Sequence, residues 1–222
     1  MGEWMVKLND KVLDNLSKLF NYSALPERYK VMERTFEIQE DDIVIDGGAY
    51  QGDMTIYFSL KVPRGLVYSF EPFTVNRLGI LNLIAKYNLY NVRLLPYALW
   101  DKNEYIPFYL SDYNNACSPL KEFRKVNPKK KITVMGGTLD RIVSFFEIPK
   151  VNHIWLNIEG SEVKAIEGAK DTLKNNDCDI IVSTHKVNEK YSTTEDVIKL
   201  LEEYGFNTRP IKSHKMWIYG WK

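Results

Sequence analysis

Short apolar runs alternate with longer segments of mixed polarity along most of the chain. Three such runs lie at 43–46 (IVID), 65–71 (GLVYSFE) and 92–99 (VRLLPYAL), and the segments between them are long enough for one helix each. Apolar strands that alternate with helices are typical of βαβ units, in which a parallel sheet is buried on both faces. The pattern therefore predicts an α/β fold.

The second half of the chain continues this alternation and ends differently. It predicts strands at 104–110, 131–136, 153–157 and 179–185, and helices from Leu139, over 162–175 and over 193–204. The last two apolar runs, FNTRPI and KMWIYGW, are separated by a few polar residues and indicate an antiparallel hairpin at the sheet edge. We expect a mostly parallel, seven-stranded sheet with helices on both faces and this hairpin at its C-terminal end.

The first part of the chain has helical spacing. Between residues 9 and 34 the apolar positions Val12, Leu13, Leu16 and Leu19 recur at helical intervals, with an interruption near Pro26. A chain of 222 residues with 45% hydrophobic side chains can bury one substantial core. We expect a helical cap over residues 1–36 and a single main domain over 37–222.

Composition and charge narrow the class of protein. Lys and Arg number 30 against 29 Asp and Glu, so no global positive field would attract nucleic acid. Cys117 and Cys178 belong to no Cys or His cluster, which argues against a disulfide framework or a zinc site. The N-terminal residues form no apolar leader, and no run of 18 apolar residues occurs. We expect a cytoplasmic protein without a transmembrane segment.

The exit of the first strand, DDIVIDGGAYQGDMT, places Gly48 and Gly52 between a buried strand and a helix. Glycines there let the backbone approach a nucleotide closely. Glu71 ends the second strand, where an acidic residue can accept hydrogen bonds from both hydroxyls of a ribose. NAD is the first rival, but the motif is not GxGxxG, and the Asp46 carboxylate would repel a pyrophosphate. A sulfonium-bearing nucleoside, S-adenosylmethionine, suits Asp46 and Glu71 better.

Four motifs in this order, IVIDGGAYQG, YSFEP, TLDRI and WLNIEGSEVKAIEGA, resemble the FkbM-type methyltransferases over about residues 40–185. The matching positions are Asp46, Gly48, Ala49, Gly52, Glu71, Pro72, Thr138, Leu139, Asp140, Glu159, Gly160 and Glu162. The resemblance implies a Rossmann-like class I methyltransferase fold that uses S-adenosylmethionine. It also implies a cofactor site made of Asp46, Gly48, Ala49, Tyr50, Gly52, Glu71, Pro72, Ala98, Leu99 and Asn157, with Ala98 and Leu99 closest to the adenine. Tyr50 and Asn157 depart from the family, which commonly has Asn and Asp there.

The stretch NIEGSE, 157–162, lies at the end of a predicted central strand and carries the candidate chemistry. An alcohol is a poor nucleophile until a base or a metal takes its proton, so Glu159, Glu162 and His185 are the candidate catalytic residues. Glu162 could instead only stabilise a helix N-terminus, and His185 could be structural. Glu159 and Glu162 are also candidate Mg²⁺ ligands, although the sequence does not require a metal.

The basic run KEFRKVNPKKK, 121–131, lies in the long connection between two strands. It could be a solvated loop, or it could contact an anionic acceptor, such as a phosphorylated or acidic glycan, or RNA. The near-neutral total charge argues against RNA. We therefore expect O-methylation of a hydroxyl on a sugar, a glycoconjugate or a related small molecule. The alternatives are an RNA methyltransferase that uses residues 121–131 and a cofactor-binding protein without catalysis. The sequence does not predict the oligomeric state.

Overall fold

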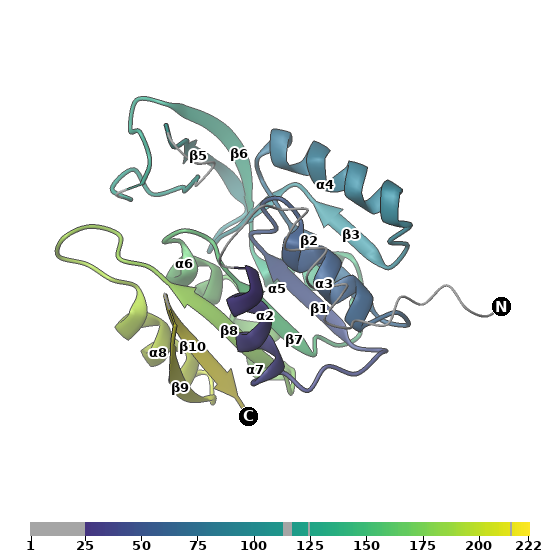
Figure 1. Ribbon diagram of the computed structural model, residues 1–222. Coiled ribbons are helices and arrows are strands. Elements are labelled where there is room, and N and C mark those ends of the chain that lie inside the picture. Colours follow the sequence, from purple (N-terminus) through teal and green to yellow (C-terminus); the bar gives the residue numbers. More distant parts are fainter. Residues whose placement is uncertain (1–24, 113–116, 124, 214) are drawn as a thin grey trace.

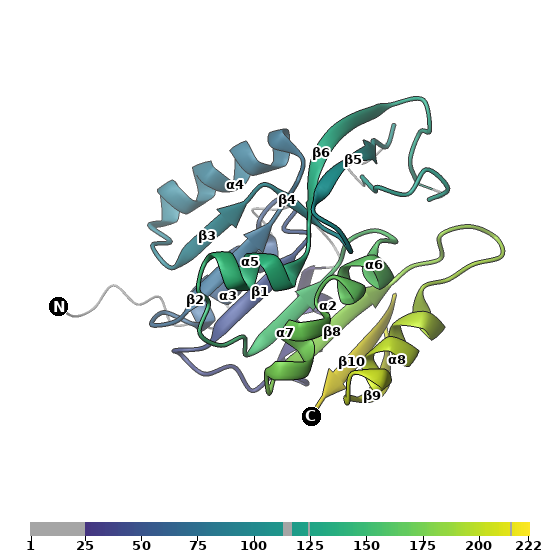
Figure 2. The same cartoon turned by 180° about the vertical axis from the view of Figure 1, so that it is seen from behind.

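A seven-stranded sheet forms the centre of the protein (Figures 1 and 2). The computed structural model describes residues 25–112, 117–123, 125–213 and 215–222. The strand order is β3–β2–β1–β7–β8–β10–β9, in which the first five strands are parallel and β10 is antiparallel to both of its neighbours. The strands are β1 (Ile43–Gly47), β2 (Leu66–Phe70), β3 (Val92–Leu95), β7 (His153–Leu156), β8 (Asp179–Thr184), β9 (Asn207–Lys212) and β10 (Met216–Trp221). This confirms the predicted sheet and its C-terminal hairpin.

Helices cover both faces of this sheet, as the sequence predicts (Figures 1 and 2). One layer contains α2 (Leu25–Glu33), α3 (Asp53–Lys61) and α4 (Thr74–Tyr87), and the other contains α5 (Leu139–Phe145), α6 (Glu162–Glu167), α7 (Lys170–Asn175) and α8 (Thr194–Glu203). Neighbouring residues of one strand belong to different cores: Val44 packs in the core under α2 and α3, and Ile45 packs in the core under α5 to α8. Strand side chains alternate between faces, so an uninterrupted apolar strand can serve two cores.

The N-terminal cap that we expected over residues 1–36 is represented in the structure by α2 and the turn after it. Tyr29 and Met32 are 2% and 0% exposed and belong to the core between α2, α3 and the sheet. The Tyr29 ring stacks on Tyr57 of α3 at 4.7 Å between centroids. This helix is therefore an integral part of one layer. The helical spacing predicted over 9–24 lies outside the described residues.

The apolar run 92–99 does not form one strand, and this prediction is wrong. It divides at Pro96 into β3, which pairs with β2, and β4 (Tyr97–Leu99), which pairs with β6 (Lys131–Gly137) in a second sheet. Proline has no N–H to donate and interrupts a strand ladder. The second sheet has the order β4–β6–β5, with β5 spanning Glu104–Tyr109, and it projects beyond the ends of the central strands (Figure 2).

The single helix predicted over 162–175 is also wrong, because the chain breaks between α6 and α7 at Gly168. A Cβ atom at this glycine would lie 1.9 Å from the carbonyl oxygen of Trp100, so the backbones touch here. The Asp140 carboxylate accepts hydrogen bonds from the N–H groups of Asp171 and Thr172, at 3.0 and 2.7 Å, and so starts α7. The aspartate of the TLD motif therefore fixes the packing of α5 against α7.

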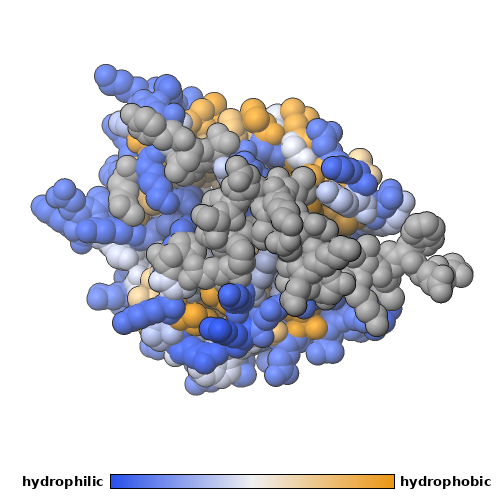
Figure 3. Space-filling model, in the orientation of Figure 1, coloured by the Kyte–Doolittle hydropathy of each residue, from blue (hydrophilic) through white to orange (hydrophobic). Residues whose placement is uncertain are grey.

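The outer face of α4 is apolar. Val75, Leu78 and Leu81 are between 50% and 64% exposed, and hydrophobic side chains gather over this helix at the upper edge of the molecule in Figure 3. Within the described ranges no helix combines the length and the apolar character that crossing a bilayer requires.

Candidate active site

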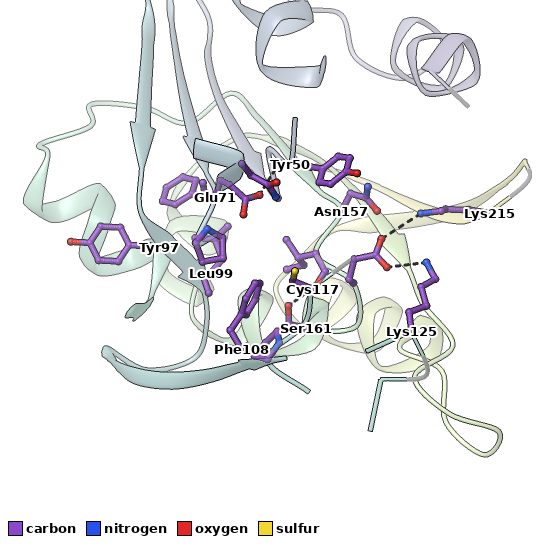
Figure 4. A pocket seen from close by; sticks show the side chains of 18 of the residues that line it. Tyr50, Glu71, Tyr97, Leu99, Phe108, Cys117, Lys125, Asn157, Ser161 and Lys215 are labelled. Atoms are coloured by element: carbon purple, nitrogen blue, oxygen red, sulfur yellow. Dashed lines mark hydrogen bonds and ion pairs between the residues drawn. The ribbon is translucent and has the colours of Figure 1, made fainter. Parts of the chain in front are cut away.

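A cavity lies at the carboxyl ends of β1, β2 and β7, between these ends and the second sheet (Figure 4). The carboxyl ends of parallel strands are where open α/β sheets bind ligands. Eight of the predicted site residues line this cavity: Gly48, Tyr50, Glu71, Pro72, Ala98, Leu99, Asn157 and Glu159. The second sheet contributes Ala98 and Leu99 from β4 and Phe108 from β5, so it forms the apolar wall.

The turn after β1 is shaped by Gly48. Its φ is +85°, and a Cβ atom there would lie 2.4 Å from the carbonyl oxygen of Asn157, so only glycine fits without displacing the backbone. The N–H groups of Gly48 and Ala49 both donate to the carbonyl oxygen of Phe70, at 3.0 Å. The turn is thereby held against the ends of β2 and β7, with its backbone bordering the cavity.

Glu71 follows β2 and faces the cavity beside this turn. Its Oε2 accepts a hydrogen bond from the N–H of Tyr50 at 2.8 Å, and its Oε1 accepts one from the N–H of Phe73 at 2.8 Å. Burial raises the pKa of Glu71 to about 7, although these two hydrogen bonds act in the opposite direction. The side chain of Asn76 also interacts with this carboxylate, and the remaining lone-pair capacity of the two oxygens is open to the hydroxyl groups of a ribose.

Asp46, Ala49 and Gly52 do not line the cavity. The Asp46 carboxylate is fully buried behind the turn, where its Oδ2 accepts hydrogen bonds from Thr55 Oγ1 at 2.6 Å and from Ser69 Oγ at 3.3 Å. Burial raises its pKa to about 7. Gly52 has φ +91° and precedes α3. These residues support the turn from behind, and a direct contact between Asp46 and a cofactor stays a prediction.

Asn157 lies at the end of β7 and faces the cavity (Figure 4). Its backbone N–H donates to the carbonyl oxygen of Gly47 at 3.0 Å. Its side-chain Oδ1 is buried and has no hydrogen-bond partner among the described residues. A buried polar atom without a partner is costly, so this oxygen is suited to accept a hydrogen bond from a ligand.

Glu159 is surrounded by cations. Its Oε2 lies 2.9 Å from Lys125 Nζ, and its Oε1 lies 3.8 Å from Lys215 Nζ and 3.5 Å from His185 Nε2. Burial alone would raise the pKa of Glu159, but His185 and the two lysines together hold it well below its usual range. The backbone of Glu159 has φ +50°, a strained conformation for this residue type. The protein thus holds a permanently ionised carboxylate at the cavity wall.

His185 and Glu162 form a buried pair behind Glu159. His185 Nδ1 lies 2.8 Å from Glu162 Oε1, which also accepts the N–H of Gly160 at 2.9 Å. Glu162 Oε2 accepts the hydroxyl of Thr193 at 2.9 Å. Burial by itself lowers the pKa of His185, but the charges of Glu162 and Glu159 raise it to about 9. His185 is therefore protonated at neutral pH, and it acts by holding Glu159 ionised.

These contacts do not fit a magnesium site shared by Glu159 and Glu162. Glu162 is 0% exposed, and both of its oxygens are engaged by protein donors. Glu159 faces three cationic groups, which would compete with a metal ion. In the part of the chain that the structure describes, no three His, Cys, Asp or Glu side chains gather to hold a metal. No step of the reaction proposed below uses one.

The protonated state of His185 makes stability depend on pH. The folded-state pKa of about 9 exceeds the ordinary value of 6.5, so this stabilisation is complete below about pH 6.5 and is lost as the pH rises through about 9. It corresponds to about 3 kcal/mol of unfolding free energy. Urea unfolding from about pH 7.5 to 9, above the pH at which Asp46 and Glu71 titrate, should show this loss, and His185→Gln should remove most of it. His153→Gln is the matched control, because burial lowers the pKa of His153; an equal flattening there would contradict the assignment.

Two basic residues of the cavity were not predicted from the sequence. Arg28 comes from α2 and binds Asp53, the first residue of α3, with Nη1 2.9 Å from Oδ2. Lys215 precedes β10, and its side chain lines the cavity opposite Glu71 (Figure 4). Because β10 is antiparallel to β8, its first residues lie at the carboxyl end of the parallel strands, with Met216 opposite Thr184. That register is the signal that identifies Lys215 as a site residue.

Comparisons with known proteins identify the family and the fold of this chain. A family model described as the methyltransferase FkbM domain matches residues 46–208, which is more than half of the chain. No curated protein matches the sequence. The structure resembles the methyltransferase FkbM from Methylobacillus flagellatus KT, with a TM-score of 0.61 and 13% identity over 84% of this chain, which spans 45% of that protein.

Two other structural relatives match over almost their whole length. One is a SAM-dependent methyltransferase from Aquifex aeolicus, with a TM-score of 0.52 and 18% identity over 96% of this chain and 98% of that one. The other is SMU.1697c from Streptococcus mutans, a putative methyltransferase solved with SAH, with a TM-score of 0.57 and 8% identity over 90% of this chain and 99% of that one. At these identities the likeness shows the class I methyltransferase fold.

Proposed function

Since the chain belongs to the FkbM methyltransferase family, we propose that it transfers a methyl group from S-adenosylmethionine to a hydroxyl of a sugar, a glycoconjugate or a related small molecule. The observation that supports this most strongly is the arrangement of two carboxylates across one cavity. Glu71 lies beside Leu99, and Lys125 and Lys215 lie on the other side, near Asn157 (Figure 4). Glu159 is on that second side, because its carboxylate contacts both lysines. We assign the first carboxylate to a ribose and the second to an acceptor.

The residues present fit the proposed cofactor. Glu71 would accept the ribose hydroxyls, and the apolar wall at Ala98 and Leu99 would contact the adenine. The methionine portion would lie along the backbone of Gly48, where a Cβ atom would leave no room, and its ammonium group would donate to Asn157 Oδ1. When bound, S-adenosylmethionine supplies an electrophilic methyl group on a sulfonium.

Glu159 has the position and charge to assist the acceptor. Its ionised carboxylate can accept the hydrogen of an acceptor hydroxyl and so orient the oxygen for attack. The acceptor oxygen would bond to the methyl carbon as the bond from that carbon to sulfur breaks, with the electron pair left on sulfur, and the hydroxyl would become strongly acidic. Glu159 then takes that proton. Its low pKa makes it a weak base, but a protonated ether gives up its proton even to a weak base.

The experiment that tests this function uses labelled cofactor. Purified protein is incubated with methyl-labelled S-adenosylmethionine and fractionated cell extract, and the labelled product is treated in parallel with glycosidase, nuclease and protease. We expect label in a fraction that glycosidase or mild acid changes and nuclease does not. Label that nuclease releases would replace the proposal with RNA methylation. Cofactor binding with no transfer to any fraction would instead favour a protein without catalysis.

A further inference from the structure

Two lysines from distant parts of the chain converge on the acceptor side of the cavity. Lys125 belongs to the basic run 121–131, and Lys215 precedes β10. Both line the cavity, and both are directed at Glu159 (Figure 4). Their side chains are only 29% and 21% exposed, so neither is an ordinary solvated surface lysine.

A buried aromatic residue supports each lysine, directly for Lys125 and through Ser213 for Lys215. Lys125 Nζ lies 5.6 Å from the ring centroid of Phe123, which is 1% exposed. The backbone N–H of Lys215 donates to Ser213 Oγ at 3.3 Å, and the same oxygen accepts the indole N–H of Trp217 at 3.1 Å. Trp217 is 0% exposed. The fold therefore positions the ammonium group of Lys125 and the backbone from which the Lys215 side chain extends into the cavity.

One carboxylate does not satisfy both ammonium groups. Lys125 forms a 2.9 Å hydrogen bond with Glu159, whereas the 3.8 Å between Lys215 Nζ and Glu159 Oε1 is too long for one. Burial lowers the pKa of Lys215, although Glu159 acts in the opposite direction. The partly buried ammonium group of Lys215, which forms no close contact with Glu159, would gain from a second anion.

The cofactor would increase this imbalance. The described charged residues that line the cavity are Arg28, Lys125, Lys215, Glu71 and Glu159, and Arg28 is already paired with Asp53. S-adenosylmethionine carries a sulfonium and an ammonium against one carboxylate, and so adds net positive charge. Even with Glu71 ionised, the loaded cavity would hold excess positive charge at its acceptor side. A neutral acceptor would leave that charge uncompensated.

We propose that Lys125 and Lys215 bind an anionic group, a carboxylate or a phosphate, that the acceptor itself carries near the hydroxyl to be methylated. This inference rests on the proposed function, because it defines the substrate class of the same site. An anion between the two ammonium groups would compete with Glu159 for Lys125 and Lys215. Glu159 would then be available to the hydroxyl of the same molecule.

The test is calorimetry on protein saturated with S-adenosylhomocysteine, with glucose, glucuronate and glucose 1-phosphate as probes that share one ring and differ in their anionic group. At least one acidic probe should bind about tenfold or more tightly than glucose, since hydrogen bonds to charged groups are the strong ones. A preference for glucuronate would assign a carboxylate, and a preference for glucose 1-phosphate would assign a phosphate. Equal affinity of all three probes would overturn the proposal.

Variants separate the two lysines from general charge effects. Lys125→Gln and Lys215→Gln should each lower the affinity for the preferred acidic probe about tenfold and leave that for S-adenosylhomocysteine unchanged. Lys129→Gln and Lys212→Gln are matched controls. Each removes the same charge from an exposed lysine that lies close in sequence to Lys125 or Lys215 and does not line the cavity. Equal losses in the controls would overturn the proposal, and so would weaker S-adenosylhomocysteine binding in the lysine variants, which would place the cofactor carboxylate at this site. Failure of the wild-type protein to bind S-adenosylhomocysteine would refute the proposed function first.

Discussion

Glu159→Gln should lower the turnover number by about 100-fold or more, because the acceptor hydroxyl loses both the charged group that orients it and the group that takes its proton. Glutamine keeps the shape of the side chain and removes the charge that Lys125, Lys215 and His185 surround. The affinity for S-adenosylhomocysteine should change little, because Glu159 contacts Lys125 and Lys215 on the side of the cavity away from Glu71. Steady-state kinetics on the acceptor found by label transfer, with calorimetry in parallel, measures both quantities.

The control for this variant is Glu189→Gln, which removes an exposed carboxylate outside the cavity. It should turn over at the wild-type rate. If Glu159→Gln also turns over at that rate while remaining folded, Glu159 is not the base. Lys215 would then be the next residue to change, because it faces the same side of the cavity and burial lowers its pKa. His185 is a weaker candidate, because its pKa is raised to about 9 and it is protonated at neutral pH.

Glu71→Ala should weaken the binding of S-adenosylmethionine and S-adenosylhomocysteine by about 2–3 kcal/mol, which is about 30- to 150-fold in affinity. Two hydroxyl groups of the ribose would lose a charged acceptor that faces the cavity. The same carboxylate also accepts the backbone N–H groups of Tyr50 and Phe73, so alanine would additionally loosen the turn. Isothermal calorimetry on the folded variant measures the loss.

A second variant isolates the charge of Glu71 from its support of the turn. Burial raises the pKa of Glu71 to about 7, so the carboxylate is protonated below that pH and accepts hydroxyl groups less well. Cofactor affinity of the wild-type protein should therefore rise between about pH 6 and 8, and Glu71→Gln should remove that dependence. An affinity that is unchanged in Glu71→Ala would exclude Glu71 from the cofactor site.

Much of the fold was predictable because its elements are short and strongly patterned. The parallel strands are apolar on both faces, and the hairpin reads as two apolar runs around a polar turn. The errors arose at two small residues. Pro96 divides an apolar run between two sheets, and Gly168 divides a helix where the Trp100 carbonyl leaves no room for a side chain. Both breaks depend on tertiary contacts that periodicity does not record.

The candidate site was predictable where a motif coincides with the end of a parallel strand. Gly48, Glu71, Asn157 and Glu159 all line one cavity for this reason. Asp46 was assigned to the same cavity from its motif, but its side chain points behind the turn toward Thr55 and Ser69. Lys215 and Arg28 have no motif, and their positions follow from the antiparallel register of β10 and the packing of α2. The set of cations around Glu159 could therefore not be predicted from the sequence alone.

The measurement that tests the central claim most directly is calorimetric titration of the purified protein with S-adenosylmethionine, S-adenosylhomocysteine and NAD. The cavity offers Glu71 for a ribose, a glycine turn that leaves no room for a Cβ atom at Gly48, and an Asn157 oxygen without a protein partner. We predict saturable binding of both sulfur nucleosides at one site, with Glu71→Ala weakening both, and no competing binding of NAD. Tight NAD binding, with neither S-adenosylmethionine nor S-adenosylhomocysteine bound, would contradict the account.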